Sequence, residues 1–206
     1  MRTLIAGLML LQTGPLLAQA SGTLVVRRSG TEIGREQVTL EQGRRRGLNG
    51  TTLTVAAKYP AAAPATQLGA RLERTPDGQF ALFQLDVERP DGPVTFLAAG
   101  AGARIVLKTI AKGSDAAQEM PGGPDVVLLD ENVVGLFAAV ADLAKPGGTR
   151  LTGFYPRSGR RVTFSATKSG SQVTLSGGIS GMLAVDATGQ LTRAELPGGV
   201  TAVLSD

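Results

Sequence analysis

The 206-residue sequence contains no cysteine, no histidine and no tryptophan. Without cysteine there is no disulfide, no zinc–thiolate site and no thiolate nucleophile. Without histidine there is no Ser-His-Asp triad and no HExxH zinc site. The catalytic chemistry that remains is that of carboxylates or of Ser–Lys pairs. No convincing motif for either is present, so the sequence predicts a protein that is not an enzyme and that uses no cofactor and no metal.

Aromatic residues and net charge are also scarce. Aromatics make up 4% of the chain, and 21 Lys and Arg face 17 Asp and Glu. Nucleic-acid binding needs a dense basic face with aromatics for stacking, so we expect no nucleic-acid partner. The densest basic run, Arg44-Arg45-Arg46, lies between Gly43 and Gly47 and indicates a solvated turn. A weak contact with an anionic envelope surface is the alternative.

The first twenty residues have the pattern of a secretory signal. Arg2 precedes an apolar run over 4–11, Gly14-Pro15 interrupts it, and the small-x-small triplet Ala18-Gln19-Ala20 follows. This run is too short to span a bilayer. The sequence therefore predicts cleavage after Ala20 and one domain over 21–206 in the periplasm or outside the cell. No transmembrane anchor is expected.

Short runs rich in Val, Leu, Thr and Ile, each ended by Gly, Pro, Asp or Asn, indicate an antiparallel meander. Turns such as Pro90-Asp91-Gly92 and Ser169-Gly170 suit tight hairpins. The predicted strands are 22–28, 31–41, 50–59, 66–75, 79–89, 93–99, 103–111, 125–129, 149–155, 160–168, 171–177, 179–186, 190–196 and 199–204.

Alternation within these runs indicates a sheet with one buried face. Phe83 and Leu85 alternate with Gln84 and Asp86, for example. The same periodicity places Glu36 inward unless a bulge at Gly34 resets the phase. Glu36 is therefore either a surface residue displaced by a bulge or a carboxylate inside the barrel.

One segment has helical spacing instead. Val133, Phe137 and Val140 recur every three or four residues within 130–145, with Asp130 as a candidate N-cap and Pro146-Gly147-Gly148 as a stop. Apolar residues surround almost the whole cylinder, so we expect the sheet to embrace this helix. The Gly- and Pro-rich stretch 113–124 has no such pattern. It is expected to be irregular, either a flap over a barrel mouth or an idle loop.

The predicted fold class is all-β with one main helix, an antiparallel curved sheet or open barrel packed around helix 130–145. Such an interior is either filled by its own side chains or open to an apolar or amphiphilic ligand. A carboxylate hydrolase using Asp125, Asp130 or Asp142 is a weaker alternative. An envelope protein is a further candidate partner. The interior-facing candidates for ligand contact are Phe83, Leu85, Val133, Phe137, Val140 and Phe164.

Four short motifs carry a resemblance to known proteins. They are GTEIGRE at 30–36, VLLDENV at 127–133, LAVD at 183–186 and GQLTR at 189–193. With them the mature chain resembles uncharacterised exported bacterial β-rich proteins, classed as domains of unknown function. The order of a long meander around one helix is also similar to the periplasmic lipoprotein carriers LolA and LolB. That second resemblance implies binding of an apolar ligand, by analogy of layout alone.

Overall fold

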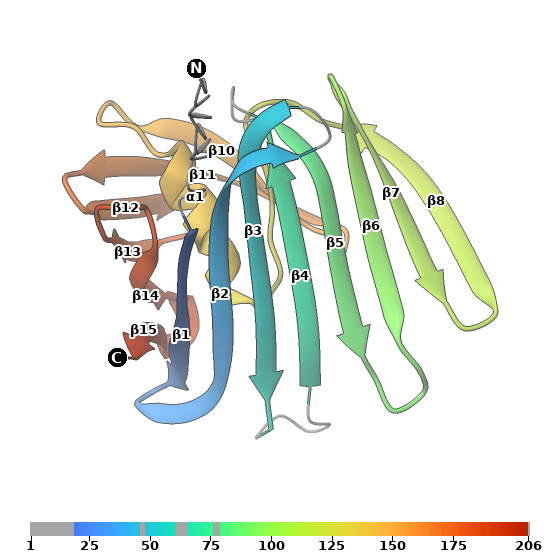
Figure 1. The fold of residues 1–206 in the computed structure, drawn as a ribbon, viewed down its shortest axis with the longest axis horizontal. Coiled ribbons are helices and arrows are strands. Elements are labelled where there is room, and N and C mark those ends of the chain that lie inside the picture. Colours follow the sequence, from blue (N-terminus) through green and yellow to red (C-terminus); the bar gives the residue numbers. More distant parts are fainter. Residues whose placement is uncertain (1–18, 46–47, 61–65, 76–78, 206) are drawn as a thin grey trace, which may run out of the picture.

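The computed structural model describes residues 19–45, 48–60, 66–75 and 79–205. They form one open sheet of fifteen strands, ordered β8-β7-β6-β5-β4-β3-β2-β1-β15-β14-β13-β12-β11-β10-β9 (Figure 1). The strands are β1 (Gln19–Arg28), β2 (Thr31–Arg45), β3 (Leu48–Tyr59), β4 (Thr66–Arg74), β5 (Phe80–Glu88), β6 (Val94–Ala101), β7 (Arg104–Ala111), β8 (Ser114–Pro121), β9 (Val126–Leu128), β10 (Thr149–Tyr155), β11 (Arg160–Ser169), β12 (Gln172–Gly177), β13 (Gly181–Val185), β14 (Leu191–Leu196) and β15 (Val200–Ser205).

The predicted fold class is confirmed. Every neighbouring pair of strands is antiparallel except β9 with β10. The sheet has two halves, β1–β8 and β9–β15, which join where β1 pairs with β15. Strands β8 and β9 are its edges.

Each predicted strand range overlaps an observed strand, but one strand was missed. The stretch 113–124, expected to be irregular, contains β8, so both the flap and the idle loop are wrong. Strand β8 is exposed along almost its whole length and therefore shows no apolar alternation. Its eight residues are held by backbone pairing with β7, together with the ion pairs Arg104–Glu119 and Lys108–Asp115.

The helix is shorter than predicted. In place of 130–145, the chain forms a 3₁₀ turn, η1 (Val134–Leu136), followed by α1 (Phe137–Leu143). Asp130 is not the N-cap, since no side chain caps either element; its Oδ1 instead accepts a hydrogen bond from the Asn132 backbone N–H at 2.9 Å. At the other end, Lys145 forms a β-bridge with Thr167. The expected embrace is confirmed, because the first five residues of α1 are all buried.

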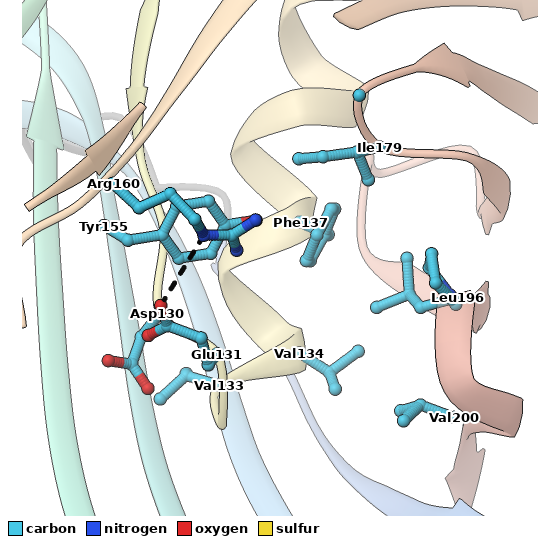
Figure 2. Close-up of a pocket in the computed structure, with 12 residues that line it drawn as sticks. Asp130, Glu131, Val133, Val134, Phe137, Tyr155, Arg160, Ile179, Leu196 and Val200 are labelled. Atoms are coloured by element: carbon cyan, nitrogen blue, oxygen red, sulfur yellow. Dashed lines mark ion pairs between the residues drawn. The ribbon is translucent and has the colours of Figure 1, made fainter. Parts of the chain in front are cut away.

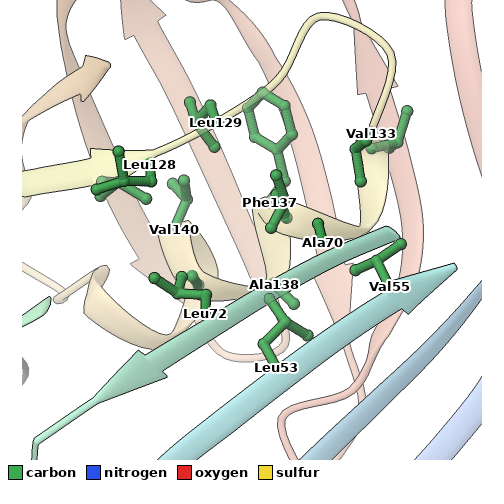
Figure 3. Packing of buried hydrophobic residues seen from close by; sticks show 14 of the residues in the cluster. Leu53, Val55, Ala70, Leu72, Leu128, Leu129, Val133, Phe137, Ala138 and Val140 are labelled. Atoms are coloured by element: carbon green, nitrogen blue, oxygen red, sulfur yellow. The ribbon is translucent and has the colours of Figure 1, made fainter. Parts of the chain in front are cut away.

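The core fills the space between the helix and the N-terminal half of the sheet. Leu53 of β3 and Leu72 of β4 are at most 3% exposed, and Ala138 and Val140 of α1 face them (Figure 3). These residues belong to one cluster that reaches both halves of the sheet. Among the described residues, no helix is long and apolar enough to cross a membrane.

Two sequence expectations fall outside the described residues. They are the signal segment up to residue 18 and the side chains of Arg44-Arg45-Arg46. Strand β1 begins at Gln19, so cleavage after Ala20 would remove its first two residues, which lie opposite Glu41 and Leu40.

Candidate functional site

A pocket of about 260 Å³ lies between the helix and the C-terminal strands. Its apolar wall is formed by Val134 and Phe137 from the helix and by Ile179, Leu196 and Val200 from the facing strands and loops (Figure 2). Leu196 ends β14 and Val200 begins β15, with the 3₁₀ turn η2 (Pro197–Gly199) between them. The meeting of a strand hairpin with the start of the helix thus leaves an apolar hollow.

The opposite rim of the pocket is polar, and its inner part is an ion pair. Asp130 Oδ2 lies 2.7 Å from Arg157 Nε, and the Asp130 side chain is fully buried. Burial raises the pKa of Asp130, although the Arg157 guanidinium opposes that shift. Both carboxylate oxygens already have partners. Oδ1 accepts the hydrogen bond from the Asn132 backbone N–H, and Oδ2 forms the ion pair with Arg157. Asp130 is therefore part of the wall, with no oxygen directed to a ligand.

The outer part of the rim consists of Arg160 and Glu131, which do not form a hydrogen bond with each other. The Arg160 guanidinium lies over the Tyr155 ring, with its carbon 4.0 Å from the ring centroid. Arg160 Nε is 3.9 Å from Glu131 Oε1, too far for a hydrogen bond. Glu131 Oε1 instead accepts a hydrogen bond of 2.8 Å from the Ser158 hydroxyl. The side chains of Arg160 and Glu131 are 49% and 35% exposed, so solvent and solutes reach both.

Behind the pocket, Glu36 fixes the start of the helix. The Val134 backbone N–H donates to Glu36 Oε1 at 2.8 Å and the Gly135 N–H donates to Oε2 at 2.6 Å. The Tyr59 hydroxyl donates to Oε1 as well. Burial raises the pKa of Glu36 above its ordinary value even though these three donors oppose the shift. Burial and the neighbouring carboxylate also raise the pKa of Tyr59.

Of the two readings left open for Glu36, the carboxylate inside the sheet is confirmed. The expected bulge exists, because Val26 pairs with Gly34 while Arg27 pairs with Glu32. It lies on the other side of Gly34 from Glu36, however. Gly34, Glu36 and Val38 therefore keep one phase, and all three are buried.

Gly135 is required at the contact with Glu36. A Cβ at this position would lie 2.7 Å from Val38 Cγ2 and 3.1 Å from Glu36 Oε2. The absence of a side chain lets the 3₁₀ turn approach β2 and β3 closely enough for both backbone hydrogen bonds.

The six residues predicted to contact a ligand are all buried within one hydrophobic cluster. Val133 and Phe137 also line the pocket. The other four, Phe83, Leu85, Val140 and Phe164, are at most 2% exposed and do not line it. The sequence pattern found inward-facing positions but could not separate a filled interior from an open one. Arg160, Ile179, Leu196 and Val200, which also line the pocket, carry no local signal that distinguishes them.

The three candidate catalytic carboxylates have separate surroundings. Asp125 is exposed and accepts a hydrogen bond of 3.2 Å from the Thr152 hydroxyl. Asp142 is exposed on α1, and Asp130 pairs with Arg157. Within the described part of the chain, no three acidic side chains gather in a way that could hold a metal ion.

The chain is similar to one solved structure, a DUF1089 family protein from Pseudomonas aeruginosa. The two are 15% identical, the match covers 96% of this chain and 98% of that one, and the TM-score is 0.47. A likeness of this extent carries no conclusion about family or activity. No family model and no curated protein matches the sequence. The likeness to LolA and LolB stays a prediction.

Proposed function

We propose that this protein is an exported, non-enzymatic binding module of the cell envelope that holds a small amphiphile in the pocket between the helix and the turn that joins β14 to β15. The supporting observation is the two-sided lining. Val134, Phe137 and Val200 offer an apolar wall, while Glu131 and Arg160 offer a charged rim that solvent reaches. Ligand sites are commonly apolar concavities with a few placed polar groups.

The size of the pocket limits the ligand. Its 260 Å³ is slightly below the ~300–1,000 Å³ of ordinary small-molecule sites. A single short aliphatic chain or a small ring fits this volume, whereas the acyl chains of a whole diacyl lipid do not. The ligand therefore lies between the helix and β14–β15 of the C-terminal half of the sheet, because buried side chains fill the space between the helix and the N-terminal half.

A second candidate is a structural or protein-interaction domain with a fully packed interior. The continuous buried cluster between the helix and β3–β5 favours it. Native mass spectrometry of protein purified from its own cells, followed by lipid extraction, separates the two functions. A reproducible small amphiphile supports binding, and its consistent absence supports the structural role.

A matched pair of variants tests the location of the site. Val200→Phe fills the pocket, whereas Val203→Phe places the same ring on the same strand, at a position that is 36% exposed and on the opposite face. By isothermal titration calorimetry with 1-octanol, we expect the wild type and Val203→Phe to bind alike. Val200→Phe should bind about tenfold more weakly or not at all. Equal binding by both variants would place the alcohol elsewhere and refute this site, provided that their melting temperatures match that of the wild type.

A further inference from the structure

The geometry points to an amphiphile with an anionic head group, a carboxylate or a phosphate, that pairs with Arg160 while its aliphatic tail lies between Phe137 and Val200. This inference rests on the proposed function and specifies its ligand class. Three observations support it: the partners of Asp130, the stacking of Arg160 and the anchoring of Glu131.

The two acidic residues of the rim do not make a cation site. Asp130 is buried and both of its oxygens are engaged, by Arg157 and by the Asn132 backbone N–H. Glu131 is held by Ser158 and stands beside Arg160.

Arg160 is presented for an anion. The guanidinium carbon lies 4.0 Å from the centroid of the Tyr155 ring, so the ring covers one side of the group, while the Arg160 side chain as a whole is 49% exposed. A planar guanidinium offers two parallel donors to a carboxylate or phosphate. The carboxylate nearest to Arg160 Nε, that of Glu131, is 3.9 Å away and forms no short contact with it. The exposed part of the Arg160 guanidinium can therefore take up an incoming anion.

Glu131 need not leave when the anion binds. Its hydrogen bond to the Ser158 hydroxyl, at 2.8 Å, is independent of Arg160. In the absence of ligand, Glu131 supplies a weak negative partner to Arg160. When an anionic head group binds, Glu131 keeps Ser158 and Arg160 pairs with the head group; the Glu131 and Arg160 side chains are partly exposed, so solvent weakens the repulsion between Glu131 and the head group.

The test is a titration series in which only the head group changes. Octanoate, octyl phosphate, 1-octanol and octyltrimethylammonium share one chain, and calorimetry at neutral pH gives the affinity of each. We expect both anions to bind about tenfold or more tightly than the alcohol and the cation to bind no better than the alcohol. Whichever anion binds more tightly identifies the source of the head group, a fatty carboxylate or a lipid phosphate.

Arg160→Gln should remove the preference for anions while leaving the affinity for 1-octanol within about twofold of the wild type. Arg160→Lys, which keeps the charge but loses the planar fork, should retain part of the preference. Arg193→Gln changes the net charge equally at an exposed position on β14 and should change nothing. A purely structural role for Arg160 would weaken all four ligands alike.

The preference for an anionic head group and the existence of the amphiphile site are tested by different outcomes. Equal affinities for octanoate and 1-octanol, both lost in Val200→Phe, would overturn the anionic head group and leave the amphiphile site standing. Tightest binding of the cation would overturn it as well. If none of the four ligands binds, the proposed function fails together with this inference.

Discussion

The two sides of the helix differ in how they are packed. Toward β3 and β4, Leu53, Leu72 and Ala138 are nearly inaccessible and fill the space (Figure 3). Toward β14 and β15, Val134 and Phe137 face Leu196 and Val200 across a hollow (Figure 2). One side of the helix therefore packs tightly against the N-terminal half of the sheet, and its other side lines a pocket against the C-terminal half.

The filled side explains how the open side keeps its shape. Glu36, on β2, binds the backbone of Val134 and Gly135 from behind, so the helix does not depend on pocket contacts for its position. A site held by a rigid support loses little affinity to reorganisation when a ligand binds. If this comparison is correct, substitutions on the filled side affect stability, and substitutions on the open side affect binding.

The largest effect is expected for Glu36→Ala. The substitution leaves the Val134 and Gly135 N–H groups and the Tyr59 hydroxyl without their acceptor in a buried place. Each unsatisfied group costs about 1–3 kcal/mol, so we expect a loss of at least about 3 kcal/mol in the free energy of unfolding. Urea denaturation measures it. Glu32→Ala, on the same strand but exposed, should cost less than about 1 kcal/mol. Similar losses in the two variants would refute the role of Glu36 in anchoring the start of the helix.

The next contrast compares a leucine on each side of the helix. Leu72→Ala removes a side chain that is 1% exposed and should cost about 2–5 kcal/mol by opening a cavity in a filled core. Leu196→Ala enlarges a hollow that already exists and should cost about 1 kcal/mol. Chemical denaturation of the two variants checks the difference, and equal losses would mean that both sides are packed alike.

Gly135→Ala should cost about 1–3 kcal/mol, because the added methyl group lies too close to Val38 and Glu36. Gly147→Ala is the matched control, since nothing lies within 4 Å of a Cβ at that position. Thermal unfolding should show a lower melting temperature for the first variant alone. An unchanged Gly135→Ala protein would indicate that the 3₁₀ turn can move away from β2 without penalty.

The smallest effect is a pH dependence. Because burial raises the pKa of Glu36, the native state holds that proton more tightly than the unfolded chain does. The part of the stability that depends on the Glu36 proton is therefore greatest below its ordinary pKa of 4.5 and is lost as the pH rises toward the higher native value. The free energy of unfolding of the wild type, measured relative to Glu36→Gln, should fall over this window. A rise instead would mean that the three donors outweigh burial.

The sequence predicted most of the fold because strand alternation and turn residues are local signals. It failed at β8, where an exposed edge strand has no apolar period, and at the helix ends, where tertiary contacts override capping residues. Glu36 could be assigned to the inner face from the phase of Val38, but its partners lie about a hundred residues away, in Val134 and Gly135. The pocket joins segments from 130 to 200 and depends on how well they fill space, which no local pattern encodes.

A crystal structure of the protein grown with octyl phosphate tests the central claim most directly. The account predicts electron density for the chain between Phe137 and Val200, with phosphate oxygens within hydrogen-bond distance of the Arg160 guanidinium and Glu131 still bonded to Ser158. An empty pocket at a ligand concentration that saturates calorimetric binding, or ligand bound only on another face of the sheet, would contradict it.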